Sequence, residues 1–485
     1  MSGHELAYGL IVAGYLVIIL AIALYVGKKW IGDESDFMVA GREMGAVITS
    51  ASLVAIILSG GFVPTVVLMG FLFGIGGAWF LWGWVVGMAL VMATWAGFWR
   101  YTGGYTPAEY FEYQYGVSGR LSVLVATMVF GIIAGAFQYV GAGALVAGAF
   151  GTDTTVTIIV IGGTITIYAL LAGMWGISIT DFIQAIWVVT AVFIAVPVYL
   201  FVNHGLPTVG ENITPEMLSF PFGSMEVFGL AGGTVITFVW LNILLANSAH
   251  YWMRASAARN ERTVRRGWML SIVIVGFCGL MGAVLGLWAR MLVAPDDPAQ
   301  AFGLLLAQET PVWLGALAVS GVIAATMSTA DMMYQMVANT VTRDFFQRFT
   351  GINSRRELLR YSRITILGMG VLTIFLATSY PGSLPQMIAF ALSMGGPLFV
   401  LSMDSWLTRF GTKEGTVIMI AAVIVAIFYW EFFSPINAQI QTLWISGAVS
   451  LVTFYSVSAL VRITGSWWGK STESLSTTTT PKGGD

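Results

Sequence analysis

The stretch Leu58-Ser59-Gly60-Gly61-Phe62-Val63-Pro64 lies in the middle of a long apolar run at 46–75. Two glycines and a proline favour interruption of a helix, because glycine weakens helices and proline removes a backbone donor. Unwound backbone at membrane depth is tolerated only where it lines a cavity. A proline kink, or glycines that allow close helix packing, would explain the same residues. The stretch therefore indicates either a broken helix beside a cavity or a kinked one.

The composition restricts the class of protein. The chain has 485 residues, of which 57% are hydrophobic and 9% are charged, whereas soluble domains carry about 25% charged residues. This excludes a soluble enzyme, a nucleic-acid binder and a disordered scaffold. The formal net charge of −2 and the single cysteine, Cys278, indicate neither a nucleic-acid partner nor a disulfide framework. The chain is therefore expected to be an integral membrane protein.

Thirteen stretches are long enough to cross a bilayer, which requires about 20 mostly apolar residues per helix. The first is expected to be a membrane helix rather than a signal peptide, because Lys28 and Lys29 follow its apolar run instead of preceding it. The expected spans are 7–27, 46–75, 77–99, 121–150, 155–174, 177–202, 226–249, 266–290, 311–340, 361–379, 383–403, 415–433 and 439–461.

The distribution of positive charge orients these spans. With the N-terminus outside and the C-terminus inside, all of the 22 Lys and Arg residues except Arg290 fall in inner loops. This agrees with the positive-inside rule, and omission of any one span would destroy the bias.

The seventh span, 226–249, is the other irregular one, because it begins with three glycines and ends with Asn242, Asn247, Ser248 and His250. Spans two and seven are five apart and run in opposite directions. Discontinuous helices in corresponding positions of two inverted halves indicate a transporter site. The expected organisation is a peripheral helix and inner loop (1–45), a five-helix repeat (46–202), an outer loop (203–225), a second repeat (226–403), two peripheral helices (404–470) and a disordered tail (471–485).

Hydroxyl and carboxyl groups in the ninth span are candidates for an ion site. Ser328 and Thr329 lie close to Asp331 in an otherwise apolar helix, and hydroxyl and carbonyl oxygens suit a hard cation such as Na⁺. Hydroxyls that bond their own helix backbone would explain the same residues. Asp181 near the start of span six is either a helix-capping acid or a functional intramembrane carboxylate.

Polar residues in the interrupted spans and their neighbours are the candidates for a solute cavity. They are Ser59, Gly60, Gln138, Asn242, Asn247, His250, Gln386 and Ser393.

Four stretches resemble the sodium:solute symporter family, which includes proline, pantothenate, acetate, sialic acid and sugar carriers. They are Ser35-Asp36-Phe37-Met38-Val39-Ala40-Gly41-Arg42, Tyr105-Thr106-Pro107-Ala108-Glu109-Tyr110, Gly173-Met174-Trp175-Gly176 with Thr180-Asp181-Phe182-Ile183-Gln184, and Ala325-Thr326-Met327-Ser328-Thr329-Ala330-Asp331 running on to Thr342-Arg343-Asp344. The topology is similar to that of the thirteen-span members.

The resemblance implies an all-α fold with a LeuT-type 5+5 inverted repeat, formed by spans 2–6 and 7–11, and alternating access. It implies a Na⁺ site made by backbone carbonyls of Ala55, Leu58 and Ala325 and by the hydroxyls of Ser328 and Thr329, with Asp181 nearby. Na⁺ would be the coupling ion, with no organic cofactor. The partners would be a small solute and the bilayer of the cell membrane.

Other functions remain open on the residues alone. Proton coupling through Asp181 or Asp331 is the main alternative, and a solute sensor that does not transport is a further one. A membrane enzyme is the least favoured, because no phosphate-binding glycine loop or intramembrane metal cluster is evident. The solute could be a small neutral compound, a zwitterion or a monocarboxylate.

Overall fold

The computed structural model describes residues 43–94, 107–171, 174–352, 354–380 and 382–465, with Trp467 and residues 9–11, 13–15, 17–18, 21–22 and 25. The first expected span is therefore described only in part. The family-like stretch at 35–42, residues 105, 106 and 173, and the tail 471–485 lie outside the described residues.

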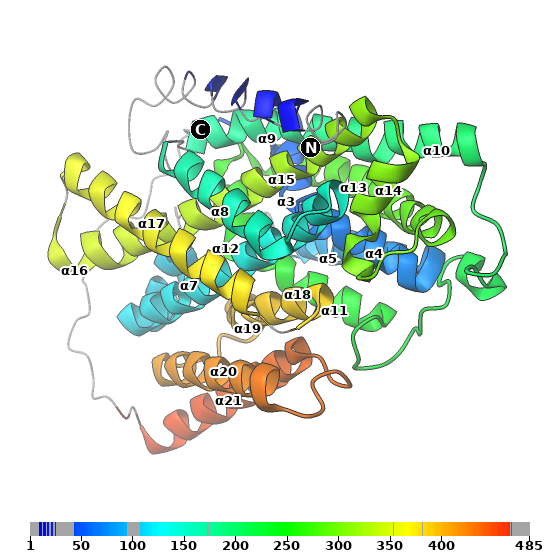
Figure 1. Cartoon of the computed structure of the whole chain (residues 1–485). Helices are drawn as coiled ribbons and strands as arrows, with labels where there is room; N and C mark the ends of the chain where they lie inside the picture. The colour runs from blue at the N-terminus through cyan, green and yellow to red at the C-terminus, as the bar shows by residue number, and fades with distance from the viewer. Residues whose placement is uncertain are drawn as a thin grey trace.

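Within these ranges the chain is helical and forms no β-strand. The first repeat contains α3 (Ala46–Ile57), α4 (Phe62–Phe73), α5 (Trp79–Thr94), α7 (Pro107–Phe150), α8 (Thr154–Leu171), α9 (Met174–Thr190) and α10 (Val196–His204). The second repeat contains α11 (Val235–Ala246), α12 (Ala249–Ala257), α13 (Glu261–Leu292), α14 (Ala301–Glu309), α15 (Val312–Asn339), α16 (Arg348–Thr350), α17 (Arg355–Ser379), α18 (Leu384–Ser393) and α19 (Gly395–Met403). The last helices, α20 (Lys413–Phe433) and α21 (Thr442–Thr464), lie side by side at one edge of the molecule (Figure 1).

Nine helices among the described residues are long and apolar enough to cross a membrane, and three shorter apolar helices accompany them. The broken spans account for part of the difference from thirteen, because their halves, such as α3 and α11, are too short to qualify. The stretch Phe62–Thr94 counts as one span, although a 3-10 turn at Gly74–Ala78 separates α4 from α5. The predicted boundary between spans two and three lies at this turn.

The irregular helices occupy corresponding places in the two repeats. The first span of each repeat is interrupted, between α3 and α4 and between α11 and α12. The fifth span of each is irregular as well, with a π-helical turn at Ala191–Ala195 before α10 and a break at Met394 between α18 and α19. This recurrence is typical of an inverted-repeat transporter fold.

Small residues bring the helices close together, as is usual inside membranes. A Cβ on Gly286 of α13 would lie 2.2 Å from the carbonyl oxygen of Val67 on α4, and one on Gly70 would lie 2.3 Å from that of Ala283. Glycine is therefore required on both sides of the α4–α13 contact.

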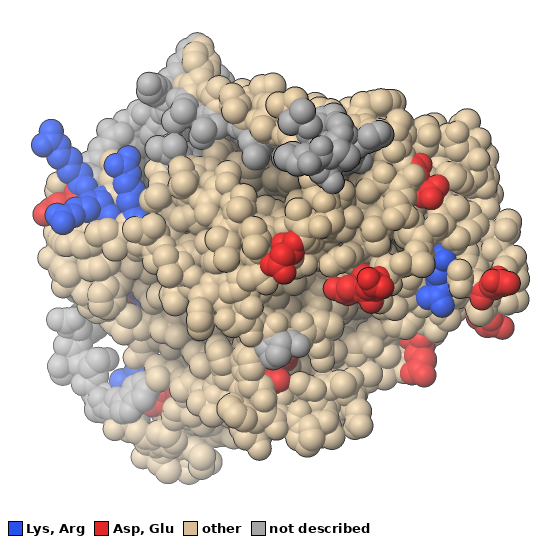
Figure 2. Space-filling model, viewed as in Figure 1, with Lys and Arg blue, Asp and Glu red and all other residues tan. Residues whose placement is uncertain are grey.

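The charge distribution agrees with the expected orientation. On the face shown in Figure 2, several Lys and Arg side chains gather at the left edge, where Figure 1 places the start of α17. Most Asp and Glu side chains on this face lie toward the middle and the right. The left edge therefore corresponds to the cytoplasmic side.

Candidate transport site

The predicted interruption of the second span is present. α3 ends at Ile57 and α4 begins at Phe62, with Leu58 to Gly61 outside helical structure. Pro64 lies in the first turn of α4, where its missing N–H leaves no helical bond unmade. The N–H of Gly61 donates to Oε1 of Gln138 on α7 at 2.8 Å. A side chain from a neighbouring helix therefore satisfies the unwound backbone.

The break lies directly against α15. A Cβ on Gly60 would lie 1.8 Å from Oγ1 and 2.7 Å from Cβ of Thr326. No side chain fits at this position without displacement of one of the two segments. Gly60 therefore sets the distance between the break and the helix that carries the predicted ion-site hydroxyls.

Four of the five residues predicted for sodium form two contacting pairs. The hydroxyl of Thr329 lies 3.3 Å from the carbonyl oxygen of Ala55, and equally far from that of Ile56. The hydroxyl of Ser328 donates to the carbonyl oxygen of Ala325 in its own helix at 2.9 Å, which is the alternative stated above for these hydroxyls, whereas Thr329 contacts a different helix. Leu58, the fifth residue, is fully buried at the start of the break. The site thus combines carbonyl and hydroxyl oxygens, which are suitable ligands for Na⁺.

Asp181 on α9 contacts the cytoplasmic halves of both broken helices. Its Oδ2 accepts a hydrogen bond from Nη2 of Arg254 on α12 at 2.7 Å and one from the hydroxyl of Ser52 on α3 at 3.2 Å. Asp181 and Arg254 are both buried. A helix-capping role therefore does not describe Asp181, because its carboxylate is engaged with two other helices.

Asp331 belongs to the same buried region but has a different environment. Only 1% of its surface is exposed, and neither carboxylate oxygen has a hydrogen-bond partner among the described residues. It interacts electrostatically with both Asp181 and Arg254. When all three groups are ionised, this cluster carries one net negative charge.

The seventh span lies later in the chain than the expected 226–249, because its helices α11 and α12 extend from Val235 to Ala257. It is interrupted at Asn247 and Ser248. The side-chain amide of Asn247 donates to the carbonyl of Ile243 at 2.8 Å, and the hydroxyl of Ser248 lies 3.0 Å from Nδ1 of His250. The His250 ring stacks on Phe130 of α7, with centroids 5.6 Å apart. α7 therefore contacts both breaks, through Gln138 at the first and Phe130 at the second.

The inner ends of the two broken helices are also joined through their backbones. The N–H of Met44 donates to the carbonyl of Ala257 at 3.2 Å, and the N–H of Arg259 donates to the carbonyl of Met44 at 3.1 Å. These bonds link the start of α3 to the end of α12. The two cytoplasmic half-helices are therefore connected as one unit.

The remaining predicted cavity residues bond to their own or adjacent helices. Asn242 donates to the carbonyl of Phe80 on α5 at 3.1 Å, and Ser393 donates to the carbonyl of Ala389 at 2.7 Å. Gln386 forms a capping box at the start of α18 with Ser383. In contrast, the buried hydroxyl of Ser59 has no hydrogen-bond partner among the described residues. Ser59 is the group at the break that is most available to a ligand.

Two features of the site were not predicted. Arg254 is the ion-pair partner of Asp181: the sequence predicted it in an inner loop, whereas it is buried in α12 beside the second break. The break at Met394 was also missed, although Gly395, Gly396 and Pro397 follow it and repeat the glycine–proline signal of the first break.

Comparisons with known proteins agree with this geometry. The profile of the sodium:solute symporter family matches residues 37–413. The chain is 25% identical over 437 residues to the high-affinity proline transporter PutP of Bacillus subtilis, covering 83% of this chain and 88% of that protein. It is 24% identical over 488 residues to a sodium/proline symporter of Staphylococcus aureus, covering 94% and 93% of the two chains.

Two solved structures share the fold. A substrate-bound, outward-open Na⁺-coupled sialic acid symporter matches with a TM-score of 0.77 at 17% identity, covering 94% of this chain and 97% of that one. The nucleobase-cation symporter Mhp1, in a closed conformation, matches with a TM-score of 0.53 at 13% identity, covering 89% and 96%. The chain therefore belongs to the sodium:solute symporter family, and it is a multi-pass membrane protein that couples movement of a solute to Na⁺ by alternating access.

Proposed function

We propose that this symporter imports a small zwitterion of the proline type, and that Na⁺ binds between the end of α3 and the middle of α15. The carbonyls of Ala55, Leu58 and Ala325 and the hydroxyls of Ser328 and Thr329 would coordinate the ion. The observation that carries the proposal is the position of the Thr329 hydroxyl, 3.3 Å from the carbonyl oxygens of Ala55 and Ile56. At that place the interrupted helix leaves carbonyls without helical donors.

Binding of Na⁺ at this position would depend on the conformation of the protein. One part of the ligand set is on α3, whose inner end is joined to α12, and the other part is on α15. A bound ion favours whichever conformation holds both parts at coordination distance. A solute that binds beside the break in the same conformation is then coupled to Na⁺ reciprocally.

The two acidic residues would contribute in different ways. Asp181 is paired with Arg254 and joins α9 to the two inner half-helices, so its role would be to close the cytoplasmic side. Asp331 has no hydrogen-bond partner among the described residues and lies two positions from Thr329. Its charge would attract the cation without direct coordination, because electrostatic interactions are weakly screened in a buried environment.

The first break favours a zwitterionic solute. α3 ends and α4 begins there, so a negative and a positive helix end lie four residues apart. The polar side chains nearby, Ser59 and Gln138, are neutral. A carboxylate would bind toward the start of α4, and an ammonium group would bind toward the end of α3. Proline is the zwitterion that we propose, because the two bacterial relatives are named as proline transporters.

Uptake by the purified protein in proteoliposomes tests the solute class. We expect radiolabelled proline to accumulate under an inward Na⁺ gradient, and we expect other small zwitterions to compete better than acetate or a neutral sugar. Competition by acetate or sugar alone would overturn the zwitterion assignment. Proline uptake driven equally well by a pH gradient in Na⁺-free buffer would instead favour the proton-coupled alternative.

A further inference from the structure

The described arginines in the cytoplasmic part of α7, after α15 and at the start of α17 fall into two groups. Those of the first group have acidic partners on neighbouring helices: Arg120 pairs with Asp344, Arg343 with Glu109 and Arg348 with Glu112. The second group is Arg356, Arg360 and Arg363 on α17, whose side chains make no ion pair or hydrogen bond within the described ranges. The second group therefore presents positive charge without a counter-ion from the described protein.

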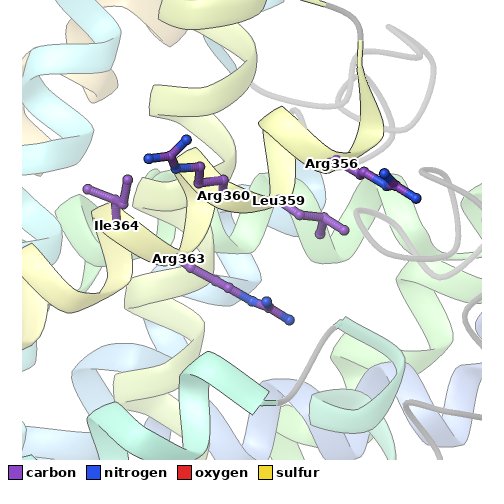
Figure 3. A pocket seen from close by; sticks show the side chains of 5 residues that line it. All are labelled: Arg356, Leu359, Arg360, Arg363 and Ile364. Carbon is purple, nitrogen blue, oxygen red and sulfur yellow. The ribbon is translucent and has the colours of Figure 1, made fainter.

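The second group lines a hollow of about 510 Å³ together with Leu359 and Ile364 (Figure 3). Spacings of four and three residues place the three arginines on one face of the helix. Figure 3 shows the three side chains diverging from α17, so their guanidinium groups are spread along the helix and do not converge on one point. Each of these guanidinium groups can bind phosphate oxygens through two parallel N–H donors.

The same helix becomes apolar directly beyond the hollow. Ile364, Leu367 and Val371 are 56%, 54% and 62% exposed and belong to a membrane-spanning helix. Positive charge at the cytoplasmic boundary followed by an exposed apolar face matches the order of groups in a phospholipid, with an anionic headgroup and then acyl chains. The three arginines could also serve only to orient the helix in the membrane, as the positive-inside rule describes. That role would not explain the hollow beside them.

We propose that the start of α17 binds the phosphate headgroups of anionic phospholipids in the cytoplasmic leaflet, through Arg356, Arg360 and Arg363. Arginine-rich sites at this depth attract anionic headgroups. α17 packs on α7, α8 and α15, and α15 carries Ser328 and Thr329. A lipid bound here would stabilise α7 and α15, the helices that contact the first break.

Thermal unfolding of the purified full-length protein tests this proposal. We expect phosphatidylglycerol to raise the melting temperature by about 2–4 °C more than phosphatidylcholine with identical acyl chains. The triple variant Arg356→Gln/Arg360→Gln/Arg363→Gln should lose this difference. A matched variant, Arg262→Gln/Arg265→Gln/Arg266→Gln, removes the same charge from the cytoplasmic start of α13 and should retain it.

The other arms of the experiment separate the alternatives. Equal stabilisation by inorganic phosphate would show an anion site that does not require lipid, and equal loss in the α13 variant would show a general charge effect; either result overturns the proposal. Native mass spectrometry supplies a readout that does not depend on stability. The wild type should retain phosphatidylglycerol, and the α17 variant, including its Arg→Ala form, should not. Equal retention by both proteins would contradict the assignment.

Discussion

The two broken helices are interrupted at the same place in their repeats but are stabilised differently. At the α3–α4 break, Gly61 bonds to Gln138 of α7 and Gly60 packs against Thr326 of α15. At the α11–α12 break, the side chains of Asn247 and Ser248 bond to carbonyls of the preceding turn. The first break therefore uses neighbouring helices in addition to its own Thr65, whose hydroxyl donates to the carbonyl of Gly61 at 2.6 Å, whereas the second is hydrogen-bonded mainly by its own residues.

This difference has a functional consequence. When a break is stabilised by neighbouring helices, binding of a ligand to those helices changes the free energy of the broken segment. One of these neighbours, α15, carries the hydroxyls of the proposed sodium site. A break that satisfies its own backbone can move as a unit without loss of its hydrogen bonds. We infer that ion binding acts through the first break and that the second follows through Asp181 and the α3–α12 backbone bonds.

The largest effect is expected for Gly60→Ala, which tests the close contact at the first break. The new methyl group would lie 1.8 Å from the Thr326 hydroxyl and would separate α3 from α15. Na⁺-driven uptake should fall by about a hundredfold, because ion ligands on two helices are misplaced together. Gly163→Ala on α8 is the matched control, since nothing lies within 4 Å of the added atom. Similar uptake by both variants would contradict the stated role of Gly60.

The second prediction compares Asp181→Asn with Asp331→Asn. The first removes the carboxylate that pairs with the buried Arg254 at 2.7 Å, so the free energy of unfolding should fall by about 3–5 kcal/mol. Asp331→Asn removes a carboxylate charge that has no hydrogen-bond partner among the described residues, so the free energy of unfolding should change little. The Na⁺ concentration for half-maximal uptake should rise by about tenfold, which corresponds to a loss of about 1.4 kcal/mol in the free energy of Na⁺ binding. Denaturation and Na⁺ titration measure the two effects. If the two variants lost equal amounts of stability, the proposed difference between Asp181 and Asp331 would be wrong.

The sequence indicated either a break or a kink in span two, because glycine and proline act locally, and it connected this segment with span nine chiefly through the resemblance to the symporter family. It did not predict the pairing of Asp181 with Arg254, because these residues are 73 positions apart and the choice of partner depends on how α9 and α12 pack. The π-helical turns, such as Ala191–Ala195, have no residue signature. The short outer helix α14 was missed because nine residues are too few for a clear apolar period.

A smaller effect is expected for Gln138→Leu, which removes the acceptor of the Gly61 N–H. A buried N–H without an acceptor lowers the free energy of unfolding by about 1–3 kcal/mol. Because Gly61 belongs to the first break, we also expect Na⁺ to stabilise this variant less than it stabilises the wild type. The matched change at the second break is Ser248→Ala, which removes a hydroxyl that bonds its own turn. We expect a loss of stability of about 1 kcal/mol or less and no change in Na⁺ dependence. A larger Na⁺ effect for Ser248→Ala than for Gln138→Leu would reverse the comparison.

The most direct test is the Na⁺ dependence of uptake by the variant Ser328→Ala/Thr329→Ala. Ser320→Ala is the matched control, because this buried hydroxyl of α15 bonds the carbonyl of Leu317 at 2.9 Å, as Ser328 bonds that of Ala325. We expect the double variant to need at least about ten times more Na⁺ for half-maximal uptake, whereas the control should match the wild type. Identical Na⁺ titrations for the double variant and the wild type would contradict the sodium site.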